Sequence, residues 1–152
     1  MAVGIIKVEG RKLLREFITF PEKLYKDCPN WVPPLILDEF DTLDRKKNAA
    51  FEFCDADYFL ARKDGKTVGR IAAIINHTAN ENWNEKTCRF GWMDFIEDLE
   101  VVEALIGAVS EWGRERGCDQ IKGPWGFTDM DKEGLLVEGY EHLSPFTCLY
   151  NY

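Results

Sequence analysis

Residues 58–76, YFLARKDGKTVGRIAAIIN, constrain the fold more than any other stretch of the chain. Asp64 and Gly65 separate two strand-like runs and fit a two-residue type I′ turn, in which both residues need positive φ. The segment IAAII is apolar without alternation, which predicts a strand covered on both faces. The chain must therefore build a sheet around this hairpin, with other elements packed on both sides of the sheet.

Helical and strand-like patterns flank the hairpin. The predicted elements are a strand at 3–8, a helix at 11–26, a helix containing Ile36, Phe40 and Leu43, the two hairpin strands, a polar loop at 77–87, a strand at 88–96, a helix at 98–117 and a strand at 119–124. Pro21 lacks an amide proton and is expected to break the first helix. Asp98 is expected to cap the long helix, and Gly117 to end it. The order β-α-α-β-β-β-α-β predicts an α/β fold with a mixed sheet.

Length and composition limit the function. A chain of 152 residues suits one compact domain, 1–152, and we expect its core at 3–123 and a turn-rich tail at 124–152. The net charge of −8 argues against a nucleic-acid partner. No apolar run approaches a membrane span, and the five cysteines are widely spaced. We therefore expect a cytoplasmic protein with reduced thiols and no membrane partner.

The segment 129–134, DMDKEG, begins like a calcium-binding EF-hand loop. An EF-hand needs a carboxylate at loop position twelve, where this chain has Tyr140, so we predict no metal. A turn into a short helix, capped by Asp129 or Asp131, is the favoured interpretation. In the alternative, the loop GPWGFTD at 123–129 borders a cleft.

From about Val3 to Gly123 the order of elements resembles the GNAT superfamily of acyl-CoA N-acyltransferases. The stretches FEFCDADYFLARKDGKTVGRIAAIINH and GPWGFTDMDKEGLLVEGY also resemble a bacterial subgroup of GNAT-like proteins of poorly defined function. In that subgroup the chain continues past the position of residue 152. The resemblance implies a GNAT-like fold that is incomplete at the C-terminus, because GNAT proteins add a helix and two strands after the fifth strand.

The resemblance also implies an acyl-CoA site where the fourth strand meets the long helix, at Phe95, Ile96, Glu97 and Asp98. Family members wrap the pyrophosphate in the backbone amides of a Q/R-x-x-G-x-G/A loop. The matching segment here, DFIEDLEVV, has no glycine and no basic residue. Its carboxylates suit a helix N-terminus without a ligand, because they interact favourably with the helix dipole themselves.

Three residues are catalytic candidates. Asp94 matches the place where GNAT enzymes keep a carboxylate that deprotonates the substrate amine, although a solvated strand carboxylate is the favoured alternative. His77, after the third strand, is a second candidate base, with a polar residue entering a loop as the alternative. Tyr140 or Tyr150 would protonate the leaving thiolate, and the sequence does not choose between them.

The sequence thus predicts transfer of an acetyl or other acyl group from acyl-CoA to a small-molecule or peptide amine. The alternative is a GNAT-like scaffold that has lost CoA binding and acts as a binding or structural module of a longer protein, which the acidic segment favours. Trp83, Trp92 and Trp125 would line a groove for the substrate or simply pack in the core. The apolar run CLYNY at 148–152 predicts a homo-oligomer that forms through an exposed C-terminal edge.

Overall fold

A computed structural model of the chain describes residues 2–143. The elements follow in the order β1 (Gly4–Lys7), α1 (Gly10–Leu24), α2 (Ile36–Thr42), the 3-10 turn η1 (Ala49–Glu52), β2 (Cys54–Lys63), β3 (Lys66–Asn76), α3 (His77–Trp83), β4 (Thr87–Phe95), α4 (Leu99–Glu115) and β5 (Gln120–Lys122). The strands form one sheet in the order β1-β2-β3-β4-β5, antiparallel except for the parallel pair β4 and β5. The predicted α/β class and mixed sheet are confirmed.

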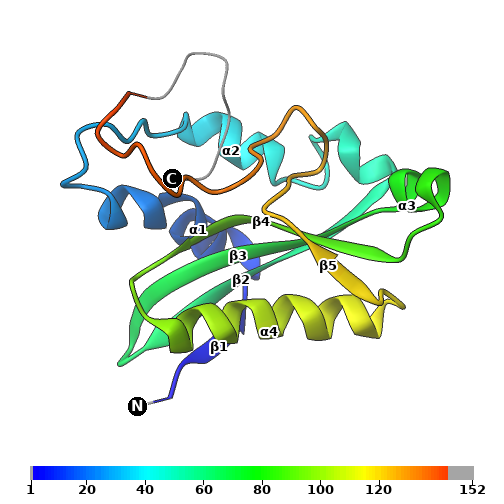
Figure 1. Cartoon of the computed structure of the whole chain (residues 1–152), viewed down its shortest axis with the longest axis horizontal. Coiled ribbons are helices and arrows are strands. Elements are labelled where there is room, and N and C mark those ends of the chain that lie inside the picture. The colour runs from blue at the N-terminus through cyan, green and yellow to red at the C-terminus, as the bar shows by residue number, and fades with distance from the viewer. Residues whose placement is uncertain (1, 144–152) are drawn as a thin grey trace.

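The predicted hairpin joins β2 to β3. Asp64 and Gly65 have φ values of 53° and 74°, as a type I′ turn requires. β3 is covered on both faces, as its continuous apolar sequence predicts. Ile71, Ala73 and Ile75 pack in the cluster that includes α4, whereas Ala72 and Ile74 pack in the cluster that includes α1. Figure 1 shows α4 on one side of the sheet and α1 and α2 on the other.

α4 begins and ends as the sequence predicts. The Asp98 side chain accepts a hydrogen bond from the Glu100 amide, and Gly117 follows the helix with φ 82°. Val101, Leu105 and Val109 are fully buried against the sheet. This helix fixes the end of β4, where the resemblance places the acyl-CoA site.

α1 continues through Pro21, so the predicted helix break is wrong. Pro21 has no N–H to donate to the carbonyl four residues earlier, that of Phe17. Arg70 supplies the missing donor, because its Nη1 lies 2.8 Å from the Phe17 oxygen. Its guanidinium carbon also lies 5.0 Å from the centre of the Phe17 ring. A side chain from β3 therefore satisfies the carbonyl that the proline leaves free.

α3 occupies a segment that the sequence predicts to be a loop, and that prediction is wrong. The Asn76 side chain caps the helix by accepting from the Ala79 amide at 2.8 Å, and Asn84 ends it with a left-handed φ of 52°. None of the helix residues is buried. Because α3 buries no apolar side chain, it lacks the hydrophobic period by which a packed helix is recognised.

After β5 the chain crosses β4 instead of running on beside it (Figure 1). The Gly123–Pro124 peptide bond is cis, and the Trp125 amide donates to the Phe90 carbonyl at 2.7 Å. A Cβ atom at Gly123 would clash with that backbone carbonyl oxygen, so the crossing requires glycine. Phe127 then enters the core on the α1 face, where it is 1% exposed.

The DMDKEG segment is a turn, and the short helix predicted for it is wrong. The Asp131 carboxylate accepts from the Thr128 amide at 3.0 Å and closes the turn. Gly134 and Gly139 have φ values of 72° and 89° and punctuate the following segment. Asp131 is thereby used inside the turn, which leaves Asp129 and Glu133 of the same motif for other contacts.

Some expectations concern the surface and the end of the chain. Within residues 2–143, no helix has both the length and the apolar character needed to cross a bilayer. The run CLYNY, through which we predict self-association, and Tyr150 lie outside the described residues. The division into a core at 3–123 and a tail at 124–152 also stays a prediction.

Candidate functional site

The segment 95–98, predicted to hold acyl-CoA, joins β4 to α4, and the Asp98 carboxylate in it is paired within the fold. Asp98 Oδ1 accepts from the Glu100 amide at 3.0 Å. Lys63 Nζ lies 2.7 Å from the Asp98 carboxylate and 2.9 Å from that of Glu100. The hydrogen bond from Lys63 lowers the pKa of the Asp98 carboxyl below its ordinary value. The N-terminus of α4 is thus already neutralised by the carboxylates of Asp98 and Glu100, and both carboxylates pair with Lys63.

A pyrophosphate does not fit this helix N-terminus. The Ile96 amide donates to the Val68 carbonyl at 3.0 Å, and the Asp98 amide donates to the Ile96 carbonyl at 2.7 Å. A ligand with two negative charges would lie beside the carboxylates of Asp98 and Glu100, and Lys63 already pairs with both. The nucleotide end of CoA therefore has no matching site at the position that the resemblance implies.

Asp94 lies inside the fold, so the alternative of a solvated strand carboxylate is wrong. It is 6% exposed, and Arg70 stands opposite it in register on β3. Arg70 Nε lies 2.7 Å from Asp94 Oδ2, and the Tyr25 hydroxyl donates to Oδ1 at 2.9 Å. Burial, followed by the charge of Asp94, raises the pKa of Tyr25, which keeps the phenol protonated.

Within residues 2–143, the edge of β4 that faces β5 is open over its second half. β5 pairs only with Thr87, Cys88 and Arg89, and no described strand pairs with residues 92–95 on that edge. Trp92 has φ 46°, and the register with β3 shifts at this point, which marks a β-bulge. An open strand edge offers N–H and C=O groups to an extended ligand.

His77 lies far from Asp94. Asp94 pairs with Arg70, and β3 runs on from Arg70 to Asn76, a separation of about 20 Å at the usual rise of a strand, before His77 begins α3. His77 Nε2 lies 2.9 Å from the Asp55 carboxylate, and both side chains are more than half exposed. The two candidate bases therefore cannot act on the same substrate atom.

Tyr140 lies against the connection between α1 and α2. Its carbonyl accepts from Asn30 Nδ2 at 2.9 Å, and its hydroxyl donates to the Leu136 carbonyl at 2.7 Å. Its catalytic role stays a prediction.

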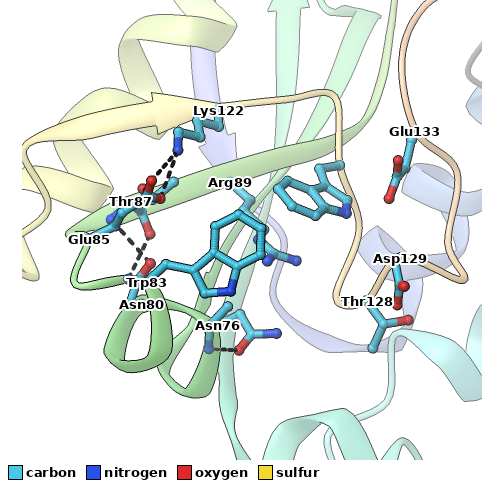
Figure 2. Close-up of a pocket in the computed structure, with 12 residues that line it drawn as sticks. Asn76, Asn80, Trp83, Glu85, Thr87, Arg89, Lys122, Thr128, Asp129 and Glu133 are labelled. Carbon is cyan, nitrogen blue, oxygen red and sulfur yellow. Dashed lines mark hydrogen bonds and ion pairs between the residues drawn. The ribbon is translucent and has the colours of Figure 1, made fainter.

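A cavity of about 480 Å³ lies between α3, the start of β4 and the segment after β5. Figure 2 shows Glu85 and Lys122 on one side of it, and Asp129 and Glu133 on the other. Lys122 Nζ lies 2.7 Å from the Glu85 carboxylate, so these two charges neutralise each other. Trp83, which is 70% exposed, adds an aromatic surface. The cavity thus combines an aromatic wall with charged groups of both signs.

Arg89 is a buried cation in the lining of this cavity. It is 7% exposed, and its Nη1 donates to the carbonyls of Gly126 and Phe127 at 3.3 and 3.2 Å. Its guanidinium carbon lies 3.7 Å from the centre of the Trp125 ring. Burial lowers the pKa of Arg89. Its hydrogen bonds to residues 2–143 go to backbone carbonyls and to no carboxylate.

Solved structures share this arrangement of strands and helices. The chain is similar to AAC(6′)-Iy in complex with the bisubstrate analogue CoA-S-monomethyl-acetylneamine, with a TM-score of 0.57 over 83% of this chain and 81% of that one, at 16% identity. A tandem GNAT protein from the clavulanic acid biosynthesis pathway, solved without acetyl-CoA, gives a TM-score of 0.56 over 76% of this chain and 34% of its own, at 14% identity. The chain has the GNAT fold. The resemblance predicted from the sequence is therefore confirmed for the fold.

The GNAT-fold chain also has bacterial relatives among curated proteins, although no family model matches it. It is 38% identical to Protein YghO of Escherichia coli K12 over 84% of its length. It is 32% identical to a bacterial ceramide synthase of Caulobacter vibrioides over 91% of its length. The chain spans only 33% and 36% of these two relatives. The bacterial origin of both relatives agrees with the predicted subgroup.

Sequence reasoning missed three residues of this GNAT fold. Arg70 and Arg89 each interrupt a largely apolar strand segment, in TVGRIAAII and CRFGW, and a charge inside such a segment was the available signal. Tyr25 gave no signal, because its partner Asp94 is 69 positions away in the chain.

Proposed function

We propose that this chain provides the GNAT-fold part of an enzyme that transfers an acyl group to an amine. The observation that carries the proposal is the edge of β4 at residues 92–95, which lies beyond the pairing with β5 and has no partner strand within residues 2–143, and which contains the bulge at Trp92. An extended acyl-carrying arm that has amide groups pairs with such an edge as an added strand would. The acceptor amine would approach from the α1 face of the sheet.

The relatives support this proposal. The bound analogue in AAC(6′)-Iy joins a CoA group to an acetylated neamine. A ceramide synthase, by its name, makes ceramide, which is the amide of a fatty acid and a long-chain amino alcohol. Acyl transfer to a small-molecule amine is the chemistry that these two names have in common.

Acyl-CoA is the donor to test first. Its acyl end suits the open edge beside Phe95 and Ile96, whereas its nucleotide does not fit the N-terminus of α4. We therefore expect the nucleotide to add little to the affinity for the donor. A shorter thioester that keeps the pantetheine arm and lacks the nucleotide should then bind about as well as acetyl-CoA.

Asp94 is the proposed general base. Because it is buried, a substrate proton would reach it through Tyr25, whose hydroxyl donates to Asp94 Oδ1 at 2.9 Å. Tyr25→Phe keeps the ring and removes only this link. If the relay operates, the variant should lose kcat with little change in KM, and an unchanged kcat would leave Asp94 and Tyr25 a structural role only. Tyr140 is the proposed acid for the leaving thiolate, and Tyr140→Phe tests that role in the same assay.

The decisive experiment incubates the full chain with acetyl-CoA and, separately, with a long-chain acyl-CoA, plus a panel of primary amines, and detects the N-acyl product by mass spectrometry. Calorimetry with acetyl-CoA runs in parallel, and Ile96→Asp, which adds a charge beside the open edge, should weaken binding. No heat at millimolar donor and no product would reject the enzyme proposal for this chain. That result would favour the alternative, a GNAT-like scaffold without CoA binding. The supporting observation for this alternative is that Asp98, Glu100 and Lys63 pair with one another at the N-terminus of α4.

A further inference from the structure

Trp92 has an unusual backbone conformation on the open edge of β4. Its φ of 46° lies in the left-handed region, which a bulky side chain rarely adopts and which is found most often where function requires it. Two contacts hold its side chain. The indole Nε1 donates to Glu39 Oε2 at 2.8 Å, and the ring lies edge-on to Phe127 at 5.7 Å between ring centres. The strained residue therefore directs its side chain to a carboxylate of α2.

Glu39 is a half-buried carboxylate without a cation. Its neighbours on α2 differ from it, because Asp41 pairs with Lys47 at 2.5 Å and Asp38 is exposed to solvent. Within residues 2–143, no positively charged side chain lies within 4 Å of the Glu39 carboxylate. Oε2 accepts from Trp92, and Oε1 forms no hydrogen bond with the described residues. A partly desolvated anion of this kind can take its counter-ion from a ligand.

Asp94 lies close to this carboxylate along β4 but is already paired. Arg70 contacts its Oδ2 and the Tyr25 hydroxyl donates to its Oδ1, so neither oxygen is left for a ligand cation. Trp92 packs in the cluster that includes α1, and Tyr25 lies at the end of α1. Figure 1 shows α2 on the same side of the sheet. The available carboxylate and the paired one thus face the side from which the proposed function brings the amine.

We propose that Glu39 binds the acceptor amine as its ammonium cation, while Trp92 positions the Glu39 carboxylate. The inference rests on the proposed function and adds the residue that selects a charged acceptor. A primary amine is mostly protonated near pH 7, so the site must first bind a cation and then remove a proton. The ammonium proton passes to the Tyr25 oxygen as the Tyr25 proton passes to Asp94, which frees the nitrogen lone pair. Glu39 therefore acts in binding, and the relay acts in the chemical step.

Amine binding to the full chain tests the inference without any acyl donor. The chain has five tryptophans, and Trp92→Phe identifies the indole N–H signal of Trp92 in a proton–nitrogen NMR spectrum by its loss. Butylamine at pH 7 should shift this signal until it saturates, because Glu39 accepts from the same N–H. Butanol keeps the alkyl chain and lacks the charge. It should bind at least about tenfold more weakly, the loss expected for one contact with a charged group.

Two substitutions of Glu39 separate a charge contact from a structural role. Glu39→Gln keeps an acceptor for the Trp92 indole and should weaken butylamine about tenfold, with no change for butanol. Glu39→Asp shortens the side chain but keeps the charge, so it should bind butylamine more tightly than Glu39→Gln does. A purely structural role predicts the opposite order. The matched control is Asp38→Asn, which removes an exposed carboxylate of α2 and should leave the affinity unchanged.

Kinetics with butylamine and an acyl donor separate binding from proton transfer. Glu39→Gln should raise KM for butylamine about tenfold with little change in kcat. Tyr25→Phe, by contrast, should lower kcat with little change in KM. A loss of kcat in Glu39→Gln with KM unchanged would assign Glu39 to the chemical step and overturn its role in binding.

The outcomes distinguish this inference from the proposed function. Butylamine binding that depends on the Glu39 charge, without any acylated product, would support the inference and reject the acyltransferase. Product formation with a KM that Glu39→Gln does not change would reject Glu39 as the ammonium site and support the acyltransferase. No shift of the Trp92 signal, or equal affinity for butylamine and butanol, would overturn the inference.

Discussion

Arg70 and Asp94 form a buried ion pair between β3 and β4, with Arg70 Nε 2.7 Å from Asp94 Oδ2 and at most 7% of either side chain exposed. The same guanidinium donates to the Phe17 carbonyl that Pro21 leaves free. Tyr25, at the end of α1, donates to the other oxygen of Asp94. One charged pair therefore joins α1 to the centre of the sheet and sets the position of the proposed base.

Removing Asp94 should be strongly destabilising. Asp94→Ala leaves Arg70 buried and unpaired, so the free energy of unfolding should fall by about 3–5 kcal/mol, measured by urea denaturation. Asp94→Ala/Arg70→Met should lose less, because no buried charge remains. As a control, Asp41→Ala breaks the exposed Lys47–Asp41 pair and should cost at most about 1 kcal/mol. Equal losses for Asp94→Ala and Asp41→Ala would contradict the prediction.

Asp57 should make stability depend on pH. Burial raises its pKa, but the hydrogen bonds from Lys7 and Trp112 more than offset this, and the pKa is lowered. A carboxyl whose pKa is lower in the folded state stabilises the fold above its unfolded pKa, and that stabilisation disappears as pH falls through the folded pKa. The difference in unfolding free energy between wild type and Asp57→Asn should therefore be largest near neutral pH and shrink below about pH 4.

The matched control for this pH effect is Asp27→Asn, which removes a carboxylate with 87% of its side chain exposed. The difference in unfolding free energy between Asp27→Asn and wild type gives the baseline for an exposed carboxylate. Urea titrations from pH 3 to pH 7 measure both variants. A difference for Asp57→Asn that changes with pH no more than this baseline would show that its hydrogen bonds do not favour the charged form.

Gly91→Ala should displace the segment that crosses β4. A Cβ atom at Gly91 would lie 2.8 Å from the Trp125 carbonyl oxygen, which belongs to the backbone and cannot move alone. We expect lower stability and faster proteolysis at 124–133. Gly107→Ala is the control, because the added Cβ atom would have no neighbour within 4 Å. This variant should stabilise α4 by about 1 kcal/mol, since alanine favours a helix more than glycine does. Proteolysis of Gly91→Ala at the wild-type rate would contradict the prediction.

The acidic N-terminus of α4 should limit the affinity for a nucleotide. Asp98→Ser/Glu100→Gln keeps a capping side chain, removes two negative charges and releases Lys63 from its ion pairs. Acetyl-CoA should then bind about fivefold more tightly in calorimetry at low salt, with most of the gain lost at high salt. Glu111→Gln, farther along α4, should change nothing. An unchanged affinity of the double variant would show that these carboxylates do not repel the donor.

Local sequence determined the elements whose signals lie within a few residues. Asp64 and Gly65 specify their turn because only their own φ values matter, and Asp98 caps α4 by bonding to an amide two residues away. The apolar run of β3 indicated burial on both faces, because no side chain in it prefers water. The long helix and the mixed sheet followed from such patterns.

The tertiary structure decided whatever depends on partners far apart in the chain. Pro21 stays inside α1 because Arg70, from β3, satisfies the carbonyl of Phe17. Asp94 is buried because Arg70 and Tyr25 meet at it, and no sequence window contains all three. The cavity exists because the chain crosses β4 after Gly123 and sets the DMDKEG carboxylates opposite α3. The free energy of a polar group depends on which partners surround it, and only the folded chain brings those partners together.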